Sequence, residues 1–430
     1  MKKCLKQFFT GIVAITMFAG SSEALKGADD FSAKVNGDIY GQVRVVGDVD
    51  GDGQKDLVFG ATDGKIHLFS ANGSEIFRPP YWPKSVDSPV LAGVEVADLE
   101  GNGSLSVIAS SMEGTVYCLS SSGKEKWKYS TGGEIRMSTP LVAAMTNFGK
   151  YDVIVNSGSG KVVWLSSDGS EKQVLNMDHS VDAAPIAIDT DKDGVKNLVV
   201  KDSSGKISIF NENGHSVNEW FTRGYGQNVW PFNIDATDID GNGSVGIFTA
   251  DGNSSDFTMW SPDGKVINSF KLSDGSHGAP KIADIDGDGV NDIIIAQADG
   301  RVIVCDKKGN VKKGWPYVSG KSIYSPPAII DIDGDGYDEV VFTATSFGGK
   351  DISAGCIIAL NKNGKMLENY PKYVGKTFAE PTFADLDGDG YLEMIVAGGI
   401  GFTGDQLHLF KTKARVRTKI AVIGQETTFK

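Results

Sequence analysis

Residues 284–292 form a nine-residue stretch with the side chains of a divalent-cation site. It reads Asp-Ile-Asp-Gly-Asp-Gly-Val-Asn-Asp, so carboxylates fall at positions 1, 3, 5 and 9. A hard cation takes several oxygen ligands, and glycine at positions 4 and 6 lets the backbone wrap around it. Without a cation, four negative charges at close range would repel one another. The stretch therefore predicts a Ca²⁺-binding loop.

The same stretch recurs along the chain, with loops that begin at residues 48, 98, 144, 189, 238, 284, 331 and 385. Four copies have carboxylates at all four positions. Their predicted ligands are Asp48, Asp50, Asp52, Asp56; Asp284, Asp286, Asp288, Asp292; Asp331, Asp333, Asp335, Glu339; and Asp385, Asp387, Asp389, Glu393. Three weaker copies offer Asp98, Glu100, Asn102; Asp189, Asp191, Asp193; and Asp238, Asp240, Asn242. The copy at residues 144–152 lacks acids at positions 1, 3 and 5, so we expect it to bind no metal.

The spacing of these copies predicts the fold. Intervals of 45 to 54 residues are typical of propellers, solenoids and other arrays. A short strand precedes each loop, a buried apolar strand such as 293–296 follows it, and glycine-containing turns separate two further strands. Four short antiparallel strands per unit are typical of a β-propeller blade.

Eight copies predict an all-β chain with eight blades in a single domain over residues 30–423, and seven blades remain the alternative. The fourth strand of the last blade comes either from residues 30–36, which would close the ring, or from residues 415–422.

The composition narrows the classes of partner. The chain has 430 residues, a formal net charge of -13 and 54 glycines, which fits an acidic all-β protein with many turns. Such acidity disfavours nucleic acid and anionic membranes as partners. No HExxH, GxSxG or Walker motif is present, and the five histidines are scattered. Cys118, Cys305 and Cys356 lie in strand-like runs and are expected to be small buried side chains.

The N-terminus is typical of a signal peptide. Lys2, Lys3 and Lys6 precede an apolar run at residues 8–19, and residues 22–24 offer a small-residue cleavage site. A membrane anchor is the alternative, but this run is too short to span a bilayer. We therefore predict a signal peptide over residues 1–24 and export to the periplasm, the cell surface or the medium.

The repeats resemble the FG-GAP and VCBS-type repeats of the N-terminal propeller of integrin α subunits and of many exported bacterial proteins. The resemblance covers about residues 36–412 and rests on eight aligned copies. It implies calcium in the loop between the first and second strands, bound by side chains at positions 1, 3, 5 and 9 and by the backbone at position 7.

The face opposite the loops is the predicted ligand-binding face. The turn between the second and third strands is longer at residues 251–256, 345–355 and 398–405, and surplus length in a turn often marks a binding loop. The linkers carry aromatic residues, including Trp82, Trp315 and Tyr324. Their rings either wedge between blades or form a platform for sugars or a protein partner.

Two function classes remain open on this sequence. The first is a non-catalytic binding or adhesion scaffold for a glycan or protein ligand. The second is a calcium-dependent polysaccharide lyase or another carbohydrate-active enzyme. A lyase needs a base and cationic groups around an acidic sugar. Arg136, Arg223, Lys350 and Lys376 form no recognisable catalytic set. Basic side chains converging at the ring centre would favour the enzyme.

Overall fold

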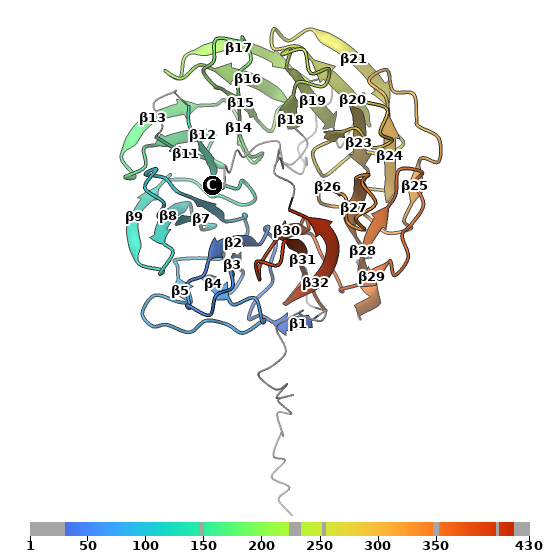
Figure 1. Cartoon of the computed structure of the whole chain (residues 1–430). Helices are drawn as coiled ribbons and strands as arrows, with labels where there is room; N and C mark the ends of the chain where they lie inside the picture. The colour runs from blue at the N-terminus through green and yellow to red at the C-terminus, as the bar shows by residue number, and fades with distance from the viewer. Residues whose placement is uncertain are drawn as a thin grey trace, which may run out of the picture.

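The chain folds into a ring of eight four-stranded antiparallel sheets (Figure 1). The computed structural model describes residues 31–145, 150–222, 234–251, 255–346, 352–400 and 404–416. Within these ranges the helical content is a single 3-10 turn, η1 (Ile352–Ala354). The prediction of an all-β propeller with eight blades is therefore confirmed, and the seven-bladed alternative is wrong.

The strands follow the chain blade by blade. Blades 1 to 4 contain β2 (Arg44–Gly47), β3 (Asp56–Ala61), β4 (Lys65–Phe69), β5 (Lys84–Ser85); β6 (Glu95–Ala97), β7 (Ser106–Ser110), β8 (Thr115–Ser120), β9 (Glu125–Ser130); β10 (Leu141–Ala143), β11 (Asp152–Asn156), β12 (Lys161–Leu165), β13 (Glu171–Asn176); and β14 (Ile186–Ile188), β15 (Asn197–Lys201), β16 (Lys206–Phe210), β17 (Ser216–Phe221). Blades 5 to 8 contain β18 (Ile234–Thr237), β19 (Gly246–Asp251), β20 (Asp256–Trp260), β21 (Val266–Lys271); β22 (Lys281–Ala283), β23 (Asp292–Ala296), β24 (Arg301–Cys305), β25 (Tyr317–Val318); β26 (Ala328–Ile330), β27 (Glu339–Thr345), β28 (Gly355–Leu360), β29 (Lys372–Tyr373); and β30 (Thr382–Ala384), β31 (Tyr391–Gly398), β32 (Gln406–Arg415), β1 (Phe31–Lys34).

Each blade runs from the ring centre to its rim, with the first strand innermost (Figure 1). The second strands, such as β7 and β23, are buried along their whole length, which explains their continuous apolar sequences. An outer strand such as β9 instead alternates between exposed and half-buried residues. A continuous apolar sequence thus indicates a strand inside a blade, and an alternating sequence indicates a strand at the rim.

The core is divided into eight apolar clusters, and each lies between two neighbouring blades. Trp82 and Trp315, from the linkers, belong to these clusters and are 1% and 8% exposed. Their indole N–H groups donate to backbone oxygens of the following blade, at Ser121 (3.1 Å) and Lys362 (3.3 Å). These two rings are therefore wedged between blades and do not form a platform for a ligand.

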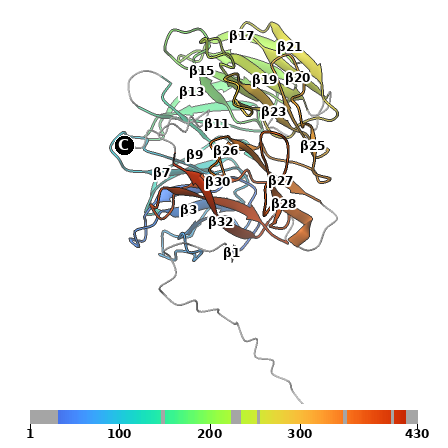
Figure 2. The same ribbon diagram turned by 45° about the vertical axis from the view of Figure 1, so that its right-hand side comes forward.

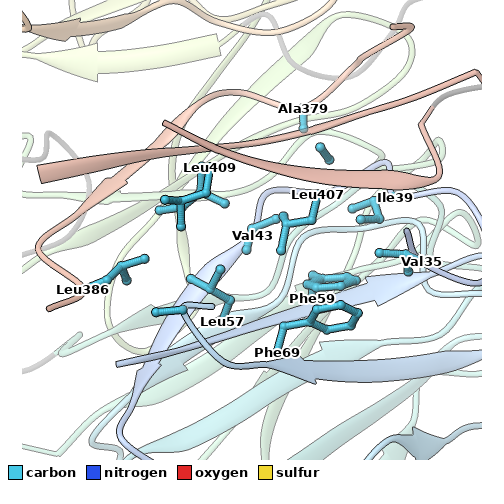
Figure 3. Packing of buried hydrophobic residues seen from close by; sticks show 13 residues of the cluster. Val35, Ile39, Val43, Leu57, Phe59, Phe69, Ala379, Leu386, Leu407 and Leu409 are labelled. Carbon is cyan, nitrogen blue, oxygen red and sulfur yellow. The ribbon is translucent and has the colours of Figure 1, made fainter. Parts of the chain in front are cut away.

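The N-terminal strand closes the ring. β1 pairs with β32, and Phe31 lies opposite Leu409, so the fourth strand of blade 8 comes from the start of the chain. Figure 3 shows the apolar side chains beneath this closure, where Leu57 and Phe59 of blade 1 lie beside Leu407 of blade 8. The turned view in Figure 2 shows blade 8 packed beside blade 7, so the ring continues without a break. Residues 30–36 rather than 415–422 therefore contain the closing strand.

The three cysteines of the described residues are buried and unpaired, as expected. The predicted signal peptide over residues 1–24 lies outside the described residues, and so do residues 417–423 of the predicted domain. Among the described residues, no helix has the length and apolar character that a membrane span requires.

Candidate metal loops and the opposite face

The four full loops share one backbone arrangement, which their own carboxylates hold. The position-1 carboxylate accepts hydrogen bonds from the N–H groups of positions 4 and 6, at 2.6 and 2.9 Å for Asp48. The same two bonds occur at Asp284, Asp331 and Asp385. Position 5 accepts the N–H of position 7 at 2.8 Å in all four loops. Glycine is needed at positions 4 and 6 because φ is positive there.

The position-9 carboxylate is the buried candidate ligand of each loop. Asp56 and Glu339 are both 0% exposed. One oxygen of each accepts the N–H of position 2, at 2.6 Å from Val49 and 3.0 Å from Ile332, while the other oxygen has no hydrogen-bond partner. A buried carboxylate oxygen without a partner is costly, so this atom marks a place where a cation would be favourable.

Burial changes the protonation of these groups. It raises the pKa of Asp56 to about 6, of Glu339 to about 8 and of Glu393 to about 7, and the neighbouring loop carboxylates add to the effect. Each shift shows that the loop disfavours a further negative charge unless a positive charge joins it.

Five loops bring three carboxylates close enough to share one ion. Ligand oxygens of positions 1, 3 and 9 lie within 4.8 Å of one another in the loops that begin at residues 48, 284, 331 and 385. In the loop that begins at residue 189, positions 1, 3 and 5 do so instead. These clusters could hold a metal ion. The position-5 residues Asp52, Asp288, Asp335 and Asp389 belong to the same loops but not to these trios.

The weaker loops have lost the buried carboxylate. Position 9 is Ser106, Asn197 or Gly246 in the loops that begin at residues 98, 189 and 238. The amide oxygen of Asn197 is turned to the backbone N–H of Thr190 at 2.9 Å. The loops that begin at residues 98 and 238 supply two carboxylates each, so they cannot form a trio. In the loop at residues 144–152, residues 146–149 lie outside the described residues.

A lysine that sequence reasoning missed lies against the loop that begins at residue 284. The Nζ atom of Lys312 is 2.8 Å from Asp286, 3.2 Å from Asp288 and 2.9 Å from Asp292. The contact with Asp292 is an ion pair. A partial sequence signal exists, because Lys126, Lys172 and Lys312 each lie 28 residues after the start of their loop. Lys413 has the same spacing from the loop that begins at residue 385, but it lies in the third strand of blade 8.

On the opposite face, four aromatic rings follow one another around the ring. Tyr40, His277, Tyr324 and Phe378 each lie four residues before the first strand of blades 1, 6, 7 and 8. Because the candidate metal loop follows that strand, these side chains lie at its other end. Ring centroids are 4.9 Å apart for His277–Tyr324, 4.8 Å for Tyr324–Phe378 and 6.0 Å for Phe378–Tyr40. We call these four residues the aromatic arc.

The predicted long turns lie beside this arc. The backbone N–H of Gly375 bonds the oxygen of Ile352 at 2.9 Å, and that of Lys376 bonds Gly399 at 2.7 Å. Ile39, next to Tyr40, bonds the oxygen of Gly404 at 2.8 Å. The turns at 345–355 and 398–405 therefore reach the loops that enter blades 8 and 1. Residues 252–254, 347–351 and 401–403 of the three long turns lie outside the described residues.

The ring centre carries charges of both signs. Lys281 of blade 6 is 3.7 Å from Glu380 of blade 8, and because these blades are not neighbours the pair lies at the centre. Arg44 pairs with Glu95 at 3.3 Å. Burial raises the pKa of nearby Asp235 to about 6, although the charge of Lys281 opposes this.

The basic residues considered from the sequence have different places in the structure. Arg136 pairs with Glu134 on the surface, Lys376 lies in the loop that enters blade 8, and Arg223 and Lys350 lie outside the described residues.

The comparisons with known proteins agree with this architecture. An FG-GAP-like repeat model matches residues 48–109 and 284–342. A model of the lambda-carrageenase beta-propeller domain matches residues 79–185. Comparison with curated proteins gave no match.

Solved structures of low sequence identity share the fold. Sqt1 from Saccharomyces cerevisiae is 12% identical with a TM-score of 0.60, over 89% of this chain and 98% of that one. BamB from Moraxella catarrhalis is 13% identical with a TM-score of 0.58, over 89% and 96%. Quinohemoprotein alcohol dehydrogenase from Comamonas testosteroni is 13% identical with a TM-score of 0.58, over 91% and 77%. These likenesses concern the fold alone, whereas each FG-GAP-like match covers two successive loops and the strands between them. The chain is an eight-bladed β-propeller that carries FG-GAP-like repeats.

Proposed function

We propose that this protein is an exported, calcium-stabilised propeller that acts as a non-catalytic binding scaffold, with its ligand on the face of the aromatic arc. The observation that carries the metal part is the buried position-9 carboxylate. Asp56 and Glu339 each keep one oxygen without a partner, inside a group of three carboxylates. Export rests on the signal-like sequence of residues 1–24.

Calcium suits these loops better than other common cations. Their side-chain ligands are all oxygen atoms, which excludes the softer metals that prefer sulfur or imidazole. Calcium accepts variable oxygen geometry, whereas magnesium demands a near-ideal octahedron and gives up its water reluctantly. Asp48, Asp50 and Asp56 would hold the ion in blade 1, and Asp331, Asp333 and Glu339 would hold it in blade 7.

A glycan fits the opposite face better than an apolar peptide. Aromatic rings can stack on the apolar face of a sugar, while nearby charged side chains bind its hydroxyl groups. In the arc, Tyr40, His277 and Tyr324 are half-buried and can offer ring surface, whereas Phe378 is buried. Lys281 and Arg44 begin the inner strands four residues after His277 and Tyr40 and supply the charged groups. One of the matched family models is named for a carrageenase, an enzyme of a polysaccharide, which also favours a glycan. The proposal also includes a protein as the second class of ligand for this face.

The alternative function is a calcium-dependent polysaccharide lyase. Two cationic side chains, Lys281 and Arg44, do lie at the ring centre. Each of them is paired with a carboxylate, so neither is available to neutralise an acidic sugar without breaking its pair. This pairing favours binding without catalysis.

A titration and a binding screen test the proposal. Calorimetric titration of metal-free protein with calcium should show uptake at several sites, and no uptake would overturn the metal assignments together. A glycan array, probed with calcium and with chelator, should then identify the ligand. The variant Tyr324→Ala should lose that ligand while the control Phe77→Ala, at an exposed residue beside the metal loop of blade 1, should keep it. Accumulation of unsaturated sugar products would favour the lyase instead.

A further inference from the structure

The loop that begins at residue 284 differs from its three full counterparts in one respect. Its acidic cluster already has a cation, the ammonium group of Lys312, which lies within 3.2 Å of three of its four carboxylates. One of these, Asp292, is the buried position-9 ligand. The ammonium group therefore lies where a metal ion would have to bind.

The backbone position of Lys312 has counterparts in blades 1 and 7. Its N–H bonds the oxygen of Val304 at 2.8 Å, as that of Ile76 bonds Leu68 in blade 1 and that of Leu367 bonds Ala359 in blade 7. Blades 1 and 7 thus place an apolar side chain where blade 6 places lysine. In all three blades one oxygen of the position-9 carboxylate has no hydrogen-bond partner, and in blade 6 that oxygen is 2.9 Å from the ammonium group of Lys312.

A lysine also reaches the loop in two further blades. Lys126 of blade 2 contacts Glu100 at 3.2 Å and the position-9 residue Ser106 at 3.0 Å. Lys172 of blade 3 pairs with the buried position-9 residue Asp152. In three blades, therefore, a lysine from the fourth strand or its approach reaches position 9 of the loop. Blades 2 and 3 have eroded acidic loops, whereas blade 6 keeps all four acids.

We infer that Lys312 is a built-in counter-ion that takes the place of calcium at the loop beginning at residue 284. That loop is consequently the weakest calcium site of the four full loops, and this ranking rests on the function proposed above. The physical reason is competition. Calcium must displace the ammonium group from Asp286 and Asp292, and the displaced charge then lies close to the bound ion and repels it.

The test exchanges the side chains between blades 6 and 7. In Lys312→Met the ammonium group is lost while an unbranched apolar side chain remains. In Leu367→Lys the ammonium group is introduced beside Glu339. Lys313→Met, at the exposed neighbouring residue, and Leu367→Met are the matched controls. Each protein is stripped of metal, and its calcium uptake is measured by titration and its Tm with and without calcium.

The inference expects reciprocal changes. Lys312→Met should take up one calcium ion more than the wild type, or bind one ion at least tenfold more tightly. It should also have a lower Tm without metal, because four carboxylates are then left uncompensated. Leu367→Lys should take up one ion fewer, and both controls should match the wild type.

Two other outcomes distinguish the counter-ion role of Lys312 from the proposed calcium binding. If Lys312→Met matches the wild type in calcium uptake and in metal-free Tm, the inference is overturned while the proposed function stands. If no variant takes up calcium but Lys312→Met alone has the lower metal-free Tm, the counter-ion role is supported and the calcium assignment fails.

Discussion

Blades 7, 8 and 1 and blades 2, 3 and 6 contain copies of one loop that differ in whether a lysine reaches position 9. In the first group the loop keeps four carboxylates, and the burial of position 9 raises the pKa of Asp56, Glu339 and Glu393. In the second group a lysine that lies 28 residues after the loop start reaches position 9. The comparison teaches that an internal side chain can occupy the place of an ion in one scaffold, and under the proposed function only the loops without a lysine should respond to calcium.

The first group also surrounds the closure of the ring. The loops of blades 1 and 8 are joined there, since the backbone N–H of Lys55 bonds the oxygen of Leu386 at 2.9 Å. The Nζ atom of Lys55 reaches the oxygen of Asp385 at 2.8 Å. On the other side, Lys413 of β32 bonds Ile332 of the blade 7 loop at 3.0 Å. Bound ions would thus stabilise the part of the ring where the two ends of the propeller chain meet.

The largest expected effect concerns the ligand, because the long turns also lie in blades 7 and 8. Shortening both turns, at residues 345–355 and 398–405, to the minimal turn of the other blades should abolish ligand binding and leave calcium uptake unchanged. These turns contact the loops that carry Phe378 and Tyr40, so they border the aromatic arc. The same assay on a variant with an altered turn in blade 3 provides the control. Retained binding in the shortened variant would show that the ligand lies elsewhere.

The second effect concerns removal of calcium. A site at tenfold excess of ligand over Kd contributes about 1.4 kcal/mol, so three sites contribute about 4 kcal/mol. With an unfolding entropy of roughly 0.8 kcal/mol per kelvin for a propeller of this size, chelation should lower Tm by about 5 °C. Millimolar calcium should restore it, and magnesium should restore it poorly.

Hydrogen exchange would locate the same effect within the ring. Chelation should accelerate exchange in β1 and β32 more than in β11 and β12, because the uncompensated loops adjoin the closure. Uniform acceleration over all blades would contradict the comparison.

Much of this organisation could be predicted from the sequence. The period and the position of each loop indicated eight blades, because every repeat carries its own strands and turns. The closing strand could not be chosen, since residues 31–34 and 415–422 are both short strand-like segments. The choice depends on pairing between β1 and β32, which lie at opposite ends of the chain.

The missed residues share a physical reason, which is that the contact forms only after the blade has folded. Lys312 is distant from its loop in sequence, and the intervening strands bring it back. The aromatic arc likewise joins Tyr40 to Phe378 across the closure. Trp82 was noticed in the sequence, but its role could not be decided there. Its linker position allowed either a ligand platform or a wedge between blades, and its contact with the next blade shows that it is a wedge.

A third expected effect is a pH dependence of the metal-free protein. The pKa of Glu339 is about 8 and that of Glu393 about 7, both raised by burial above the ordinary 4.5. Between the ordinary pKa of 4.5 and these raised values, the folded state therefore binds more protons than the unfolded state. The contribution of these two groups to stability must fall as pH rises through this range.

The clearest window for this measurement is pH 6.5 to 8. Below it, burial of His408, whose pKa is lowered to about 4, makes stability rise with pH and opposes the trend. Metal-free protein should have a lower Tm at pH 8 than at pH 6.5, and saturating calcium should remove the difference. The variant Glu339→Gln should reduce it. A Tm that rises over this window without metal would contradict the uncompensated state of these loops.

The smallest expected effect is seen when a loop that lacks a lysine, in blade 8, is compared with a loop that pairs with a lysine, in blade 3. Glu393→Gln in blade 8 should lose one calcium site, and with it about 1.4 kcal/mol of the stabilisation that calcium provides at tenfold excess over Kd. Asp152→Asn in blade 3 removes a buried carboxylate that pairs with Lys172, so the ammonium group loses its partner. This variant should lower Tm equally with and without calcium, because an internal pair is broken and no metal site is touched. Titration and paired Tm measurements distinguish the two. If Asp152→Asn reduced calcium uptake, or if Glu393→Gln lowered Tm equally in both conditions, the division of the blades into ion-held and lysine-held loops would be wrong.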